Sequence, residues 1–175
     1  MEIFPVESWR DLYVMLGTSS AALVGLLFVA ASIHLKEVLR NEILYTRTRN
    51  ITLHLIITLV QAAAVLTPQP RAFLGSELVL TNLFGLWPPL SFTYRVFVRE
   101  RKLGRSGGFS IYRAANYIAA YIVGLAGGAV LACGLDWGMY LVTASYVNFL
   151  AGAIWNNWAI MFGVDQIDRA KQRSH

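Results

Sequence analysis

The sequence predicts an all-α fold: a polytopic helical membrane protein with five transmembrane helices. Five stretches contain no Asp, Glu, Lys or Arg, and they cover residues 12–35, 50–70, 78–94, 114–135 and 137–164. About 20 apolar residues in a helix are enough to cross the hydrocarbon layer of a bilayer. Because hydrophobic residues make up 56% of the 175 residues, little of the chain remains for a soluble domain. We expect one transmembrane domain over residues 1–175, with spans at approximately 12–34, 50–67, 77–95, 115–135 and 138–162.

Lys and Arg are distributed unevenly between the segments that connect these spans. Residues 36–49, 95–113 and 165–175 carry 13 of the 15 basic residues, whereas residues 1–11 and 67–77 carry one each. Basic loops stay on the cytoplasmic side of a membrane, which predicts an outside N-terminus and a cytoplasmic C-terminus. This placement also accounts for the net charge of +5, so we expect no nucleic-acid partner.

The first span begins at a helix-capping pattern and carries a face of small residues. Ser8 and Asp11 have the spacing typical of a helix start. Gly17, Ala21 and Gly25 then recur every four residues, and small residues at this spacing let another helix approach closely. We expect this face to contact a neighbouring copy of the chain. Packing on other spans of the same chain is the alternative.

The second span carries a polar stripe, and the third carries two adjacent prolines. His54, Thr58 and Gln61 share one helix face, which we expect to meet protein rather than lipid. Pro88 and Pro89 remove two backbone donors near the middle of the third span. This predicts that the third helix is kinked or broken at Pro88-Pro89.

The last two spans are expected to form a closely packed antiparallel hairpin, because the turn around 134–138 is short. Both spans carry a stripe of small or polar residues at intervals of four. These stripes are Ala120, Gly124, Gly128 and Ala132 in the fourth span, and Ala144, Asn148, Gly152 and Asn156 in the fifth. We expect the two stripes to meet.

Motifs of catalysis or metal binding are absent from the sequence, so we expect no enzymatic activity and no cofactor. A secondary alternative rests on His34 and His54, which the predicted topology puts at the cytoplasmic ends of adjacent spans. Two facing imidazoles can ligate a b-type haem or a metal ion. Interfacial histidines bonded to backbone or lipid phosphate are the other interpretation.

Neutral polar residues within the spans leave two roles open. Thr58, Gln61, Asn148 and Asn156 either hydrogen-bond between helices or line the pore of a homo-oligomeric channel. No charged residue lies in the middle of a span, which disfavours ion-coupled transport.

The third loop is the most basic segment of the chain. Its basic residues include Arg99, Arg101, Lys102 and Arg105. Each attracts anionic phospholipid head groups by about 1 kcal/mol near a membrane surface. We expect this loop to dock on such head groups at the cytoplasmic face or on a partner protein. A role in setting the topology alone is the alternative.

The N-terminal segment Trp9-Arg10-Asp11-Leu12-Tyr13-Val14, followed by the small-residue face and the apolar run 25–30, resembles a group of small bacterial multispan membrane proteins. The group has no established activity. The resemblance therefore implies a location in the bacterial inner membrane and no particular chemistry.

Together these observations predict a non-enzymatic integral membrane protein. It is expected to act through helix contacts, as a homo-oligomer or as an accessory subunit of a larger membrane complex. A homo-oligomeric channel lined by neutral polar residues is the first alternative. A b-type haem-binding subunit that uses His34 and His54 is the second.

Overall fold

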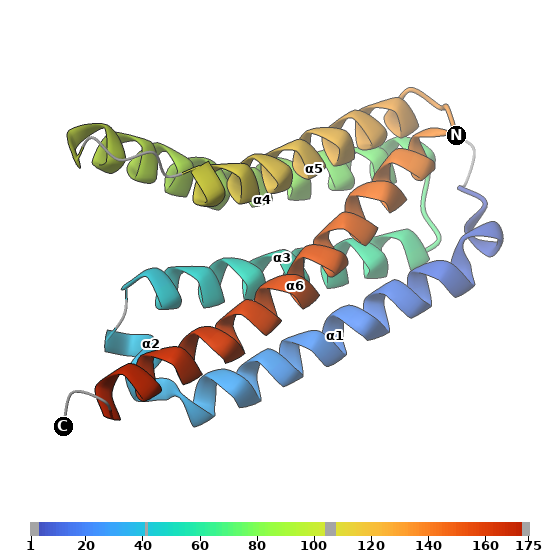
Figure 1. The fold of residues 1–175 in the computed structure, drawn as a ribbon. Helices are drawn as coiled ribbons and strands as arrows, with labels where there is room; N and C mark the ends of the chain where they lie inside the picture. Colours follow the sequence, from blue (N-terminus) through green and yellow to red (C-terminus); the bar gives the residue numbers. More distant parts are fainter. Residues whose placement is uncertain (1–3, 41, 104–107, 173–175) are drawn as a thin grey trace.

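The computed structural model describes residues 4–40, 42–103 and 108–172, with side chains over most of 4–94 and over 115–155 (Figure 1). The described residues form helices and turns, without a strand, which confirms the all-α prediction. The long helices are α1 (Arg10–Ile33), α3 (Glu42–Leu66), α4 (Arg71–Leu103), α5 (Gly108–Ala132) and α6 (Gly138–Gln172). Two short ones, η1 (Val6–Ser8) and α2 (Leu35–Arg40), precede α1 and α3 respectively.

The long helices alternate in direction along the chain, and the two termini lie at opposite ends of the bundle (Figure 1). α1 packs on α3, and α4 packs along α5 in the most extensive contact of the structure. α6 crosses between these two pairs and contacts α5, α3 and α1. The chain therefore runs back and forth between two ends of a single bundle.

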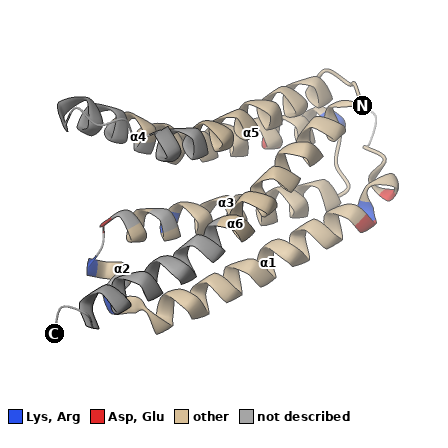
Figure 2. Ribbon diagram, in the orientation of Figure 1, with Lys and Arg blue, Asp and Glu red and all other residues tan. Residues whose placement is uncertain are grey.

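Among the residues that the structure describes, three helical segments are long and apolar enough to cross a membrane: Arg10–Ile33, Leu44–Leu66 and Ala115–Ala132. Figure 2 shows that the charged residues drawn lie toward the helix ends and the connections, with uncharged helix between them. Large apolar side chains such as Phe28 and Trp87 are more than 70% exposed. An apolar outer surface of this kind is suited to a lipid environment.

The helix boundaries differ from the predicted spans because helices continue beyond their apolar segments. α3 begins at Glu42, eight residues before the expected start at residue 50. α4 is one continuous helix through Pro88 and Pro89, so the break considered above is absent. A hydroxyl side chain bonds a backbone carbonyl in this stretch, because Ser91 Oγ donates to the carbonyl oxygen of Pro88 at 2.9 Å. A kink at this point stays a prediction.

Glycines allow the closest helix contacts. A methyl carbon placed on Gly75 of α4 would lie 2.5 Å from the backbone nitrogen of Ala132 in α5. One placed on Gly138 of α6 would lie 2.5 Å from the carbonyl oxygen of Gly127 in α5. The turn between α5 and α6 uses Gly134 with φ of 89°, a conformation that glycine adopts without strain. α5 is thereby held closely between α4 and α6.

Candidate functional site

The interior of the bundle contains a layer of polar side chains that come from different helices. Thr58 and Gln61 of α3 and Asn82 of α4 are fully buried, His54 of α3 is 2% exposed, and Ser145 of α6 is 1% exposed. The polar stripe of α3 therefore faces protein. Buried polar groups need hydrogen-bond partners, so this layer defines which helices must meet.

His54 is held by an aromatic cage and by one hydrogen bond. Its Nδ1 atom lies 2.6 Å from the hydroxyl oxygen of Tyr121 in α5. The imidazole stacks on the rings of Tyr117 and Phe149, with centroid distances of 4.5 and 5.8 Å. Gly85 of α4 makes room for the ring of Tyr121, which a larger residue there would overlap. His54 thus joins α3 to α5 and α6.

The remaining polar groups of α3 also make bonds inside the bundle. Thr58 Oγ1 donates to the carbonyl oxygen of His54 at 2.9 Å. Gln61 Nε2 donates to Thr81 Oγ1 of α4 at 2.7 Å. On the opposite side of α3, Ser20 Oγ of α1 donates to the carbonyl oxygen of Leu55 at 2.6 Å. The bonds of Gln61 and Ser20 join two helices, as interhelical hydrogen bonds do in membrane proteins, whereas the bond of Thr58 stays within α3.

Two polar oxygens meet at Gly124 of α5. A methyl carbon placed on Gly124 would lie 2.5 Å from Asn82 Oδ1 and 3.0 Å from Ser145 Oγ. Asn82 is oriented by its amide nitrogen, which donates to the carbonyl oxygen of Leu78 at 2.7 Å. Within the described residues, Asn82 Oδ1 and Ser145 Oγ have no hydrogen-bond partner. The absence of a side chain at Gly124 is what allows α4 and α6 to bring these oxygens beside α5.

The two histidines lie at different levels of the bundle. His34 follows the last residue of α1, and its ring is partly exposed. His54 is next to Leu55, whose carbonyl oxygen accepts the hydrogen bond of Ser20 in α1. His34 follows Ser20 by 14 residues, which corresponds to about 21 Å along α1. The expectation that both histidines lie at the cytoplasmic ends of adjacent helices is therefore wrong for His54, because α3 starts earlier than predicted. Because the two imidazoles lie at these different levels, they do not face each other as a pair of haem ligands would.

The small residues of α1 divide into two groups. A methyl carbon on Gly17 would lie 3.3 Å from Cβ of Ala62 in α3, so Gly17 packs within its own chain rather than on a neighbouring one. Ala21 is exposed, and a methyl carbon on Gly25 would meet nothing within 4 Å.

The stripe of α5 divides between two partners. Gly128 and Ala132 pack on α4, near Gly75 and Val79, instead of on α6 as expected. Gly127, one position beside the stripe, forms the close contact with α6. Ala120 is buried in the cluster around Tyr121, and Gly152 of α6 lies against the hydroxyl group of Tyr117.

The proposed polar lining does not share one surface. Thr58 and Gln61 are enclosed, whereas Asn148 of α6 bonds Asn116 of α5 on the exposed side of the bundle. Asn116 Nδ2 donates to Asn148 Oδ1 at 3.1 Å, and Asn148 Nδ2 donates to Asn116 Oδ1 at 3.4 Å. Five predicted site residues lie outside the described side chains: Arg99, Arg101, Lys102, Arg105 and Asn156.

The described side chains include no group of three or more His, Cys, Asp or Glu residues that is able to hold a metal ion. Comparison of the chain with protein-family models, curated proteins and solved structures finds no match. The resemblance to small bacterial multispan membrane proteins stays a prediction. The geometry defines a helical protein with membrane-compatible helices, an internal polar layer and one exposed pair of carboxamides.

Proposed function

We propose that the protein is a five-span integral protein of the bacterial inner membrane that acts without catalysis, as a subunit of a homo-oligomer. In this proposal its N-terminus is outside, its C-terminus is cytoplasmic, and α4 is kinked near Pro88. Support comes from long helices that alternate in direction, and from basic residues concentrated in the segments at one end of the bundle.

The exposed pair of Asn116 and Asn148 carries the proposal of a subunit contact. Asn148 lies near the middle of the charge-free stretch 137–164, and Asn116 lies at the start of the apolar segment Ala115–Ala132. Each carboxamide offers two N–H donors and an acceptor oxygen. The mutual bonds use one N–H donor of each side chain, which leaves a second donor on each, and Asn116 is exposed.

Lipid tails offer no partner to any of those remaining groups that face them. Leaving a polar group without a hydrogen bond in hydrocarbon is costly, and polar residues within a membrane usually face protein or water. A second copy of the chain presents the same carboxamides, so two copies are able to exchange hydrogen bonds. An axis along the membrane normal keeps both copies in the same orientation. Exposed Ala21 and Gly25 provide a further face where a helix of another copy is able to approach.

The experiment compares the double variant Asn116→Leu/Asn148→Leu with Val147→Leu, which changes an exposed apolar residue of the same helix. We expect the wild-type protein and Val147→Leu to remain oligomeric by mass measurement in mild detergent, and the double variant to become monomeric. A cysteine at exposed Ala119, with Cys133 replaced by Ser, should also cross-link between copies in native membranes. A wild-type monomer without this cross-link would defeat the proposal.

The proposed topology has a separate test. Reporter fusions after His175 and within residues 100–108 are both expected to be cytoplasmic. The channel alternative has less support, because Thr58 and Gln61 are enclosed within the chain and do not share a surface with Asn148.

A further inference from the structure

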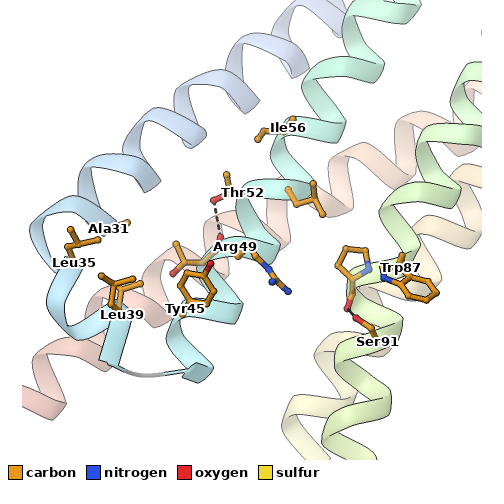
Figure 3. A pocket seen from close by; sticks show the side chains of 13 residues that line it. Ala31, Leu35, Leu39, Tyr45, Arg49, Thr52, Ile56, Trp87 and Ser91 are labelled. Atoms are coloured by element: carbon orange, nitrogen blue, oxygen red, sulfur yellow. Dashed lines mark hydrogen bonds between the residues drawn. The ribbon is translucent and has the colours of Figure 1, made fainter.

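A pocket of about 700 Å³ opens between α3 and α4 and extends to α2 and the end of α1. Figure 3 shows its walls, with Ala31, Leu35 and Leu39 on one side and Trp87 and Ser91 of α4 on the other. The volume lies in the range of sites that bind small molecules. Several of its wall residues are also large exposed apolar residues, including Leu39 at 62% and Trp87 at 73%. The pocket is therefore open to the surroundings of the helices.

The chemistry of the pocket changes along α3. Tyr45, Thr48, Arg49 and Thr52 line the part that lies near the start of the helix. Farther along the same helix the lining becomes apolar, with Leu53 and Ile56 opposite Trp87 and Pro88 of α4. A ligand that fits this gradient has a polar head and an apolar chain.

Arg49 supplies the charge of the polar end. Its side chain reaches from α3 into the space toward α4 (Figure 3). The thirteen residues that line the pocket include no Asp or Glu, and no ion pair to Arg49 is found among the described residues. A guanidinium group recognises phosphate by charge and by paired N–H donors. The head group that matches this end is anionic.

We propose that this pocket binds an anionic glycerophospholipid of the cytoplasmic leaflet, with its phosphate on Arg49 and an acyl chain against Leu53, Ile56 and Trp87. The choice of leaflet rests on the proposed topology, which puts the start of α3 on the cytoplasmic side. A free phosphate ion would use Arg49 but would leave the apolar end uncovered. The lipid accounts for both ends.

The first test measures binding of short-chain phosphatidylglycerol to delipidated protein in a neutral detergent by native mass spectrometry. Phosphatidylcholine of equal chain length is the uncharged comparison. We expect tighter binding of phosphatidylglycerol, and a loss of about fivefold in its affinity for Arg49→Gln, the effect of one basic residue near a membrane surface. Arg49→Lys should retain most of the affinity. Arg40→Gln, which removes an exposed charge of α2 outside the pocket, should leave it unchanged.

The second test narrows the pocket from its α1 wall. Ala31→Phe adds a ring to the pocket wall, whereas Ala22→Phe adds the same ring to an exposed position of α1 outside the pocket. Only Ala31→Phe should lower phosphatidylglycerol binding, with both variants showing the wild-type helical circular dichroism.

Three results would overturn the lipid site: equal losses for Arg49→Gln and Arg40→Gln, equal affinity for both lipids, or displacement of phosphatidylglycerol by an equal concentration of inorganic phosphate. Unchanged binding in Ala31→Phe would do the same. Failure of the proposed topology is distinguishable, because a C-terminal reporter outside the cell leaves binding in detergent intact. Failure of the subunit proposal is distinguishable too, because the oligomer test does not involve Arg49.

Discussion

His54 of α3 and Tyr121 of α5 are joined by a hydrogen bond of 2.6 Å, although 67 residues separate them in the chain. Both are buried, and Phe149 of α6 stacks on the imidazole. One histidine therefore specifies how three helices come together. Deep polar contacts of this kind constrain helix register, since apolar side chains alone fit several registers.

Removing the hydroxyl group of Tyr121 should destabilise the bundle. In Tyr121→Phe the buried Nδ1 atom of His54 loses its partner, and an unsatisfied buried group costs about 1–3 kcal/mol. We expect a lower midpoint of thermal unfolding in detergent. The double variant His54→Phe/Tyr121→Phe removes both polar partners and should be less destabilised than the sum of the two single variants. Additive losses would mean that the two groups do not interact.

At Gly124 of α5 the structure leaves no room for a larger side chain. In Gly124→Ala the new methyl group would meet Asn82 Oδ1 at 2.5 Å and Ser145 Oγ at 3.0 Å, so one of them must move. Overpacking of this kind costs about 1–3 kcal/mol. Thermal unfolding in detergent is the measurement. The matched control is Gly25→Ala, where a methyl group meets nothing within 4 Å and helix propensity should stabilise the protein slightly.

Relief of the clash separates crowding from other effects of the Gly124 substitution. Asn82→Ala shortens the side chain that the methyl group approaches most closely. In the background of Gly124→Ala it should cost less than in the wild-type protein. An equal cost in both backgrounds would show that the two positions are independent.

The sequence was sufficient to predict the helical class, the approximate positions of the long helices and the inward orientation of the α3 stripe. Charge-free length determines the first two, and the third follows because His54, Thr58 and Gln61 share one helix face. The depth of His54 does not follow from the sequence, because the charged residues Glu42, Arg47 and Arg49 predict a connecting loop, whereas α3 already begins at Glu42. The length of an apolar stretch indicates which part of a helix is suited to lipid, but it does not indicate where the helix begins.

The sequence also does not show which helix packs against each small-residue stripe. Gly124 and Gly128 were recognised as close-contact positions, but spacing alone does not say which helix approaches. The short turn between α5 and α6 predicts that α6 is the partner of this stripe. In the structure, Gly128 and Ala132 instead lie against Gly75 of α4. Tyr117 and Tyr121 share a helix face and are the missed residues of the polar layer. Their four-residue spacing was the available signal.

Gly75 should be the least tolerant glycine tested. In Gly75→Ala the methyl group would lie 2.5 Å from the backbone nitrogen and 2.7 Å from Cα of Ala132. Backbone atoms move only with their helix, so α4 and α5 must separate. We expect a larger loss of thermal stability than in Gly124→Ala, where a side chain is able to rotate. A milder effect of Gly75→Ala than of Gly17→Ala, which meets only Cβ of Ala62 at 3.3 Å, would contradict the closeness of this contact.

The last prediction concerns the ion pair that joins the start of α4 to the turn between α5 and α6. Arg71 Nη2 donates to Asp136 Oδ2 at 3.2 Å, and Arg71 Nε lies 3.1 Å from Asp136 Oδ1. The Arg71 side chain is 23% exposed and the Asp136 side chain 50%, so water and salt weaken the pair. Asp136→Asn should therefore lower the free energy of unfolding by no more than about 1 kcal/mol, and the difference from wild type should shrink at high ionic strength. Thermal unfolding at low and at high salt measures both effects, with Glu7→Gln as the control. Glu7 lies 3.9 Å from Arg10 in a more exposed pair, and its loss should be smaller still. A salt-independent loss of several kcal/mol in Asp136→Asn would mean that this carboxylate acts through the turn itself rather than through Arg71.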